Sequence, residues 1–481
     1  MKIRQQDGLT FDDVLLVPQY SKIRSRKDVS TTATLVPGIQ LNIPIVSANM
    51  DTITETRMSI AMAKNGGIGI IHRFMSIETQ AEKIKKVKRA ESLIVENPIT
   101  IPATATLENA RQKMAEEGVG GLMVVDEHNH LVGIVSRRDV LLAKGDQLAI
   151  ADFMTPRERL IVADLHVSIE TARQKLHDHR IEKLPLVDPQ GRIAGLITAQ
   201  DIIKIQEHPN ATKDERGRLR VGAAIGVRMD DFERAAACID AGADLLVLDI
   251  AHGHSEHTSA MVRKLKISYP SIPLIAGNVA TAAGVQELAD AGADAVKVGV
   301  GAGSICITRI VTGFGVPQLT AIMDCAERGH QLNIPIIADG GIRTSGDITK
   351  SLAAGASTVM IGSLLAGTDE SPGAPIVRQG RHYKVVRGMA SLTANVDRLK
   401  LDRGEDFGEE DWAEVVPEGV EAIVPYRGAV GDILHQLVGG FRSGLSYAGA
   451  QTIEELWEKA EFIRVTAAGK EESGPHDVDL A

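Results

Sequence analysis

The chain has 481 residues, a formal net charge of −10 and aromatic side chains at only 3% of its positions. This length exceeds one ordinary domain, so we expect two or three domains and a large core. The acidic balance argues against nucleic-acid partners, and the few aromatic side chains argue against a base-stacking platform. No apolar run has the length of a signal core or a membrane span, so we expect no membrane association.

The cysteines are few and unevenly spaced. Cys238, Cys306 and Cys325 form neither a disulfide framework nor a paired metal-ligand spacing. Unpaired thiols are typical of a reducing compartment, so we expect a cytoplasmic protein.

Apolar segments alternate with helical patterns along most of the chain, after a short apolar opening that ends at a proline. Eight segments have the aliphatic and β-branched composition of buried strands: 43–47, 66–72, 221–227, 245–249, 274–278, 295–298, 336–341 and 358–363. Eight strands separated by helices predict an α/β fold, a (β/α)₈ TIM barrel with its site at the C-terminal strand ends. A doubly wound open sheet would instead need a glycine-rich dinucleotide loop after an early strand.

An internal repeat interrupts this alternation between the second and third predicted barrel strands. The sequence 110–114 (ARQKM) recurs at 172–176 (ARQKL), an offset of 62 residues (172 − 110), and further blocks recur at the same offset. Each copy has the pattern helix, strand, turn, strand, helix, which predicts a separate domain. The expected organisation is a first barrel part at 1–91, a repeat domain at 92–208 with copies 92–150 and 151–208, and a second barrel part at 213–481.

The loop 299–309 combines three alternating glycines with reactive side chains. The glycines allow tight turns and close approach of the backbone to a ligand. Cys306 is a candidate nucleophile and Thr308 a candidate proton relay, because converging backbone N–H groups can stabilise a thiolate. The alternative is a small buried cysteine in a glycine turn.

Further polar groups follow other predicted strands. Asp339-Gly340-Gly341 and Gly362-Ser363 come after the seventh and eighth strands, where barrels often bind phosphate, and Ser304 is expected to converge with them. Ordinary glycine turns are the alternative. Asp339 is a candidate for ribose binding or for capping the next helix, and Asp249, after the fourth strand, is a candidate for binding a second ligand.

Four features together resemble the IMP dehydrogenase/GMP reductase family: the cysteine loop, the sequence 339–343 (DGGIR), the sequence 364–373 (LLAGTDESPG) and the inserted repeat. The resemblance covers essentially the whole chain. The repeat is similar to the paired CBS (Bateman) domains that this family carries within its barrel and uses to bind regulatory purine nucleotides. The resemblance implies an oxidoreductase of purine nucleotides that forms a homo-tetramer or homo-octamer.

The same resemblance implies a role for each candidate residue. Cys306 attacks C2 of the purine ring, and Thr308 and Glu418 are the other catalytic residues. The residues that bind GMP or IMP are Met50, Asn278, Ser304, Asp339, Gly341, Gly362, Ser363, Gly388 and Met389. Asp249, Gly299 and Gly301 bind the nicotinamide cofactor, and the carbonyl groups of Gly301, Gly303 and Cys306 bind a monovalent cation such as K⁺. Regulatory ATP or GTP contacts Ser136, Asp139, Thr198 and Asp201, which alternatively cap the last helix of each repeat copy.

The family contains two activities that share a thioimidate on the cysteine. Dehydrogenases hydrolyse this adduct, for which the resemblance implies an Arg-Tyr pair on a flap, whereas the flap here, 395–416, has Arg403 followed by Gly404. The acidic neighbours of Arg403 favour its protonated form, a poorer base. Alternatively, Arg398 substitutes for it. Asn49 and Ala390 also resemble the reductases.

Other features resemble the dehydrogenases: the sequence 415–420 (VVPEGV), Ser363 and the segment 472–478. Val386 replaces a tyrosine common to both branches. Because hydrolysis needs a base, we predict a GMP reductase that uses NADPH, with an IMP dehydrogenase that uses NAD as the alternative. A nucleotide-sensing protein without catalysis is a third hypothesis, against which the retained Cys306, Thr308 and Glu418 argue.

Overall fold

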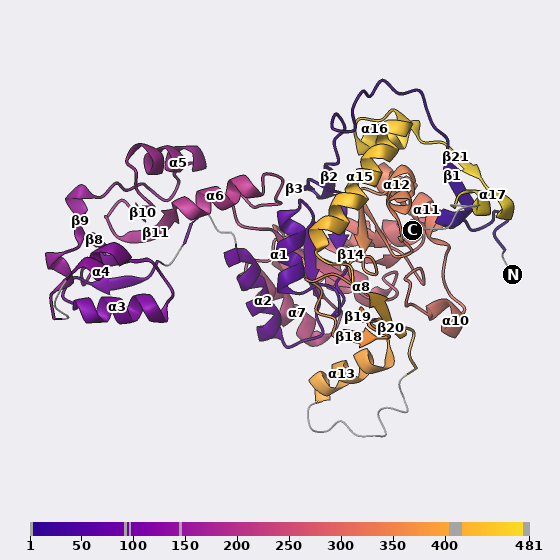
Figure 1. Cartoon of the computed structure of the whole chain (residues 1–481). Helices are drawn as coiled ribbons and strands as arrows, with labels where there is room; N and C mark the ends of the chain where they lie inside the picture. The colour runs from indigo at the N-terminus through magenta and orange to yellow at the C-terminus, as the bar shows by residue number, and fades with distance from the viewer. Residues whose placement is uncertain (1–2, 91–93, 96–97, 144–146, 404–415, 475–481) are drawn as a thin grey trace. The chain divides into compact units, whose positions relative to one another are not determined.

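The computed structural model describes residues 3–90, 94–95, 98–143, 147–403 and 416–474 (Figure 1). Contacts divide the chain into two compact units. The first comprises Met1–Ala90, Asn210–Asp214 and Leu219–Ala481, and the second comprises Glu91–Pro209 and Glu215–Arg218. Within the described residues, no helix is both long and apolar enough to cross a membrane.

The first unit contains the predicted TIM barrel. Among the described residues, eight parallel strands close in the order β12-β13-β14-β15-β16-β17-β4-β5. Their bounds are β4 Ile45–Ser47, β5 Ile68–Ile71, β12 Val221–Ile225, β13 Leu245–Asp249, β14 Leu274–Val279, β15 Ala295–Val298, β16 Ile336–Asp339 and β17 Thr358–Ile361. The prediction of an α/β barrel is confirmed. The strands β5 and β12 are neighbours, with Ile70 opposite Gly222, although the second unit separates them in sequence.

The barrel forms because its strands are apolar on both faces and its helices on one. The helices that follow the strands are α1 Thr56–Lys64, α2 Ile77–Ala90, α7 Met229–Asp240, α8 Glu256–Ser268, α9 Ala282–Ala291, α11 Gln318–Leu332, α12 Ser345–Ala353 and α15 Val430–Ala448. Side chains such as Val296 and Val298 pack outward beneath these helices, whereas Ala295 packs in the barrel interior. A hairpin of β2 (Ala33–Val36) and β3 (Ile39–Leu41) contributes Leu35 and Leu41 to the same interior cluster.

Smaller elements surround the barrel. A three-stranded antiparallel sheet contains β18 Pro375–Arg378, β19 Arg381–Arg387 and β20 Glu421–Pro425. The short helix α10 Thr308–Thr312 follows the cysteine loop, and α13 Leu392–Arg403 follows β19. The chain ends pair through β1 Val14–Leu16 and β21 Phe462–Arg464, near α16 Ile453–Lys459 and α17 Ala467–Glu472.

The second unit repeats its elements at the offset seen in the sequence. The helix α3 Leu107–Glu116 returns as α5 Ile169–Asp178, 62 residues later (169 − 107), and the strands β7 Gly121–Val125 and β8 Leu131–Ser136 return as β10 Lys183–Val187 and β11 Ile193–Thr198. The last helices of the copies are α4 Arg137–Leu142 and α6 Ala199–Glu207. The first copy adds β6 Thr100–Pro102 and β9 Thr155–Pro156.

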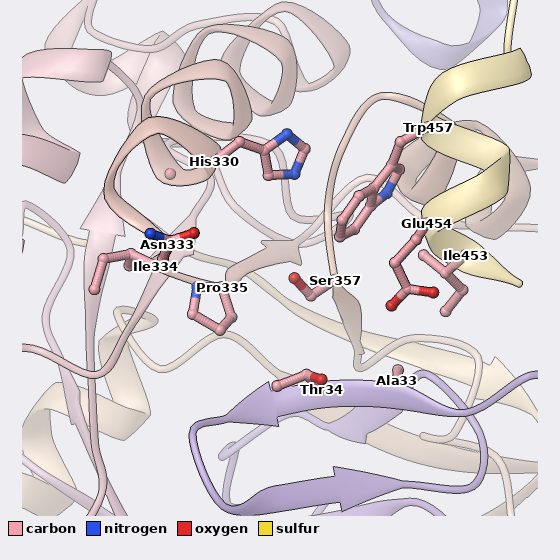
Figure 2. A pocket seen from close by; sticks show the side chains of 11 residues that line it. Ala33, Thr34, His330, Asn333, Ile334, Pro335, Ser357, Ile453, Glu454 and Trp457 are labelled. Carbon is pink, nitrogen blue, oxygen red and sulfur yellow. The ribbon is translucent and has the colours of Figure 1, made fainter.

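A cavity of about 370 Å³ lies at the N-terminal ends of the barrel strands, where Pro335 precedes β16 and Ser357 precedes β17 (Figure 2). One wall is formed by Trp457, whose ring centroid lies 4.4 Å from that of His330. The face of a TIM barrel that usually carries the active site is the opposite one.

Candidate active site

The candidate site lies at the C-terminal ends of the barrel strands, where the loops after β4, β13, β14, β15 and β16 meet. A cavity of about 310 Å³ brings together ten of the predicted residues: Met50, Asp249, Asn278, Gly299, Gly301, Gly303, Cys306, Thr308, Asp339 and Met389. These residues are far apart in sequence, and most of them lie at or after the ends of the neighbouring strands β13, β14, β15 and β16. The convergence expected for a barrel site is therefore present in the structure.

Cys306 is the thiol suited to chemistry. It is half-buried at the cavity, and its Sγ lies 3.1 Å from the Thr308 Oγ1, a distance at which a proton can pass between thiol and hydroxyl. Burial raises the pKa of Cys238 to about 12, and burial together with Asp324 does the same for Cys325. Those two thiols stay protonated and inert at neutral pH.

The cysteine loop is fixed by backbone hydrogen bonds. The Cys306 N–H donates to the Gly303 carbonyl at 3.1 Å, and the Ile307 N–H donates to the Glu418 carbonyl at 2.8 Å. Gly299 has φ +151°, and a side chain there would collide with the carbonyl oxygen of Asp339, so the first turn of the loop requires glycine. The loop is thus held between the end of β16 and the segment that carries Glu418.

A buried lysine lies beneath the cavity. Lys297, the third residue of β15, is 1% exposed and contacts Asp249 at 2.9 Å, Asn278 at 2.5 Å and Asp339. Burial opposes its charge, but Asp249 and Asp339 outweigh burial and raise the pKa of Lys297. Burial likewise opposes ionisation of Asp249, yet the charge of Lys297 leaves the pKa of that carboxyl lowered. Asp249 and Lys297 therefore form an ion pair inside the barrel.

Predicted phosphate-binding residues lie beside this cluster. The Ser304 hydroxyl donates to the Ser363 hydroxyl at 3.3 Å, so the loops after β15 and β17 meet as expected. Gly341 has φ +78°, and Gly362 lies close to the sulfur of Met50. The Gly388 N–H donates to the Val420 carbonyl at 3.1 Å. These five predicted residues are not among those that line the cavity.

The loop after β4 is tied to two other loops. The Asn49 amide donates to the second carboxylate oxygen of Asp249 at 2.6 Å. The Asp51 N–H contacts the Met389 sulfur at 3.4 Å, and the Arg387 guanidinium donates to Asp51 at 2.8 Å and to Asp397 of α13 at 2.7 Å. Arg387 therefore joins the β4 loop to helix α13.

A second cavity, of about 480 Å³, adjoins the first and shares Val300 and Thr308 with it. Glu418 lines this second cavity together with His252 and His254. In the part of the chain that the structure describes, no group of three or more His, Cys, Asp or Glu residues is arranged to hold a metal ion.

The four residues predicted to contact regulatory nucleotides lie in the second unit. Ser136 and Thr198 cap α4 and α6, and their hydroxyls donate to Asp139 at 2.7 Å and to Asp201 at 2.6 Å. The structure thus contains the capping arrangement that the sequence left as an alternative. Thr198 and Asp201 also line a cavity of about 770 Å³.

Sequence reasoning missed several residues of the site. Lys297, Arg73 and Asn395 line the candidate cavity without having been singled out, whereas Asn49 and Arg398, named above only for telling the two activities apart, line it as well. Lys297 had a detectable signal, because a charged residue inside a strand that is apolar on both sides needs a buried partner. Asn395 and Arg398 come from α13, within the predicted flap 395–416. Gly404 and the rest of the flap up to residue 415 lie outside the described residues.

The fold and the site define a TIM-barrel protein with a half-buried loop thiol at the C-terminal ends of its strands. Residues 8–476 match the family model of the IMP dehydrogenase / GMP reductase domain, and the chain belongs to this family of oxidoreductases. The resemblance seen in the sequence is confirmed. Members of the family bind IMP or GMP and use nicotinamide cofactors.

Relatives named as dehydrogenases and relatives named as reductases are both similar to this chain over nearly its full length. The inosine-5'-monophosphate dehydrogenase of Nitrosopumilus maritimus is 55% identical over 99% of each chain, and the GMP reductase of Leishmania major is 49% identical over 98% of this chain and 97% of its own. The structure of the GMP reductase of Trypanosoma brucei in complex with guanosine 5'-monophosphate aligns with a TM-score of 0.89 at 46% identity, over 98% of each chain.

The described residues fit a nicotinamide cofactor. Asp249 offers an ionised carboxylate, held by Lys297 and Asn49, that can accept hydrogen bonds from ribose hydroxyls. The adjoining cavity of about 480 Å³ is lined mainly by apolar and small side chains and reaches Thr308, which suits a planar ring next to the thiol.

Proposed function

We propose that this protein is a GMP reductase, which converts GMP, NADPH and two protons to IMP, NADP⁺ and an ammonium ion. One observation carries the proposal: the cysteine, threonine and glutamate that act on the purine are all retained, while Gly404 stands where the dehydrogenases have the tyrosine of their water-activating pair. Without an efficient base for water, the adduct on Cys306 is better suited to accept hydride than hydroxide.

Each step uses residues around the cavity. The sulfur of Cys306 adds to C2 of the bound purine as the thiol proton passes through the Thr308 hydroxyl, 3.1 Å away, toward the amino group that will leave. Thr308 and Glu418, which line the same adjoining cavity, deliver protons to the amino group as it leaves as ammonia. A reduced nicotinamide held near Asp249, Gly299 and Gly301 would supply the hydride for C2, and cleavage of the C2–S bond would return the Cys306 thiolate.

The remaining assignments follow from the family. Met50, Asn278, Ser304, Asp339, Gly341, Gly362, Ser363, Gly388 and Met389 bind the nucleotide, and Asp249, Gly299 and Gly301 bind the cofactor. The carbonyls of Gly301, Gly303 and Cys306 are the proposed ligands of a monovalent cation. The Gly303 carbonyl accepts one hydrogen bond, from the Cys306 N–H, and keeps a second lone pair for such an ion.

The second candidate function is IMP dehydrogenase, which converts IMP, NAD and water to XMP and NADH. The relative from Nitrosopumilus maritimus, which carries that name at 55% identity, favours it. Arg398, which lines the catalytic cavity, would then replace the missing pair as the base.

A two-substrate assay separates the candidates. The protein is incubated with GMP and NADPH in one reaction and with IMP and NAD in another, and cofactor absorbance and nucleotide products are followed. We expect GMP-dependent oxidation of NADPH with release of ammonia. Formation of XMP at a normal turnover rate, without oxidation of NADPH, would instead establish the dehydrogenase. Activity in neither assay would support a nucleotide-sensing protein.

We also propose that residues 92–208 are a pair of CBS repeats that regulates the barrel by binding ATP or GTP. The cavity of about 770 Å³ in this unit is large enough for a purine nucleotide, and Lys183 and Arg137 line it with positive charge. Titration calorimetry of the full chain, with Cys306→Ala to prevent turnover, is expected to show ATP or GTP binding that Asp201→Asn weakens. No binding of either nucleotide would exclude this regulation.

A further inference from the structure

Lys297 lies where a barrel normally places a hydrophobic residue. In β15 the side chains alternate, so Val296 and Val298 pack beneath the helices while Ala295 and Lys297 face the barrel interior. Burying an unpaired ammonium group costs several kcal/mol, so a lysine at 1% exposure is retained only with compensating partners. Those partners show what the residue does.

The ammonium group uses its three N–H bonds on three different strands. It contacts Asp249 at the end of β13 at 2.9 Å, Asn278 of β14 at 2.5 Å and Asp339 at the end of β16. The Asn278 amide in turn donates to Asp339 at 3.0 Å. One side chain thus fixes the orientation of three residues that all line the catalytic cavity.

We propose that Lys297 is a positioning residue shared by the nucleotide site and the cofactor site. This inference rests on the proposed function, in which Asp339 binds the nucleotide and Asp249 binds the cofactor. The single ammonium group is the counter-ion of both carboxylates and orients them as hydrogen-bond acceptors. Without it, the two like charges at one cavity repel each other, and Arg73, which also lines the cavity, is the other cation that acts on Asp249.

Lys297→Met tests the proposal because it removes the charge and keeps the length of the side chain. We expect the affinities for GMP and for NADPH, measured separately by calorimetry, each to fall at least about tenfold, the effect of losing one charged hydrogen bond. By contrast, Asp339→Asn is expected to lower the affinity for GMP alone, and Asp249→Asn is expected to lower the affinity for NADPH alone. If Lys297→Met lowers the affinity for only one of the two ligands, or for neither, the proposal is overturned.

The pH profile provides a readout that a purely structural role would not change. Burial opposes ionisation of Asp249 and the charge of Lys297 favours it, so loss of that charge raises the pKa of Asp249, and the low-pH limb of kcat/KM in Lys297→Met is expected to move to higher pH. Lys297→Arg keeps the charge and is expected to keep the limb of the parent protein. An unmoved limb in Lys297→Met would contradict the shared counter-ion.

Lys88→Met is the matched control. Lys88 is also a buried lysine between two carboxylates, 3.0 Å from Asp214 and 2.8 Å from Asp244, but it lies at the N-terminal ends of the strands. Its loss is expected to lower thermal stability without moving the limb. If Lys88→Met shifts the limb as much as Lys297→Met does, the effect is one of stability and the proposal fails.

A charge-balanced double variant keeps the test valid if Lys297→Met does not fold. Lys297→Met with Asp249→Asn leaves a single carboxylate, Asp339, so folding and GMP affinity are expected to recover while NADPH affinity stays low. Further loss of GMP affinity in the double variant would refute the proposal. If the parent protein binds GMP and NADPH but turns over neither substrate pair, the proposed function fails. The affinities for GMP and NADPH in the Lys297 variants still test the positioning role of Lys297 in that case.

Discussion

Burial decides which side chains of this chain can react. The sequence contains three cysteines whose thiols have the same intrinsic reactivity. The fold leaves one of them at a cavity, with a hydroxyl 3.1 Å from its sulfur. The other two sit in the core, where burial raises the thiol pKa to about 12. In the proposed mechanism, the Thr308 hydroxyl is the nearby group that relays the proton of this thiol.

Thr308→Val is expected to lower kcat by about 10²–10³-fold, because general acid–base catalysis typically contributes that much. Thr308→Ser keeps the hydroxyl and is expected to retain most of the activity. Steady-state kinetics with GMP and NADPH checks both variants, with GMP affinity of the Val variant as the test of folding. Equal activity of the Val and Ser variants would remove the proton relay from the mechanism.

Glu55 supplies a pH dependence of stability. Its carboxylate accepts a hydrogen bond from the buried His72 and lies 2.6 Å from Lys83 Nζ, and these partners lower the pKa of Glu55 to about 2. An acid whose pKa is lowered by folding stabilises the protein above its ordinary pKa, near 4.5, and loses that stabilisation as the pH falls toward 2.

Glu55→Gln is therefore expected to lower the free energy of unfolding by about 1–3 kcal/mol at pH 7, with the two proteins converging near pH 2. Urea unfolding at a series of pH values measures the difference. Glu82→Gln, an exposed position on the helix that carries Lys83, is the control and should change little. A constant difference between the Glu55 variant and the parent from pH 7 to pH 2 would contradict the assignment.

One arginine ties helix α13 to the β4 loop. Arg387, at the end of β19, contacts Asp51 of the β4 loop and Asp397 of α13, and its side chain is 21% exposed. The helix in turn brings Asn395 and Arg398 to the cavity wall. Ala394 and Val396 of the helix are buried, and Arg387 adds a polar clamp to this packing.

Arg387→Met is expected to lower kcat/KM for GMP about 10–100-fold, since two charged hydrogen bonds that place the cavity wall are lost. Arg381→Met, an exposed position at the other end of the same strand, is the control and should leave kcat/KM unchanged. Initial rates and thermal unfolding are measured for both. An unchanged kcat/KM in Arg387→Met would show that α13 is held without the clamp.

At the scale of the whole molecule, the barrel closes across the place where the second unit is inserted. The strands β5 and β12 pair directly, and the connecting segments on either side meet at Lys88, whose Nζ contacts Asp214 at 3.0 Å and the Leu219 carbonyl at 2.9 Å. These contacts belong to the first unit. The barrel therefore has its own closure and its own core.

Replacement of residues 92–208 by a Gly-Ser linker of about six residues, with a reach of about 13 Å, is expected to leave a folded and active barrel. Any effect of ATP or GTP on the rate should disappear in this variant. Circular dichroism, thermal unfolding and GMP turnover with and without ATP or GTP provide the comparison. Loss of folding would show that the second unit is part of the barrel's core stability.

The amino-acid sequence by itself determined the barrel, the repeat and the reactive loop, because each is written in local patterns: apolar runs, a fixed offset of 62 residues, and glycines around a cysteine. Only the tertiary structure decided which charged side chains form ion pairs with one another. Lys297 meets Asp339 across 42 residues of sequence, and Arg387 meets Asp51 across 336. Such pairs have no periodicity for a sequence to display, since they form only when barrel closure places distant strand ends side by side and removes water from between them.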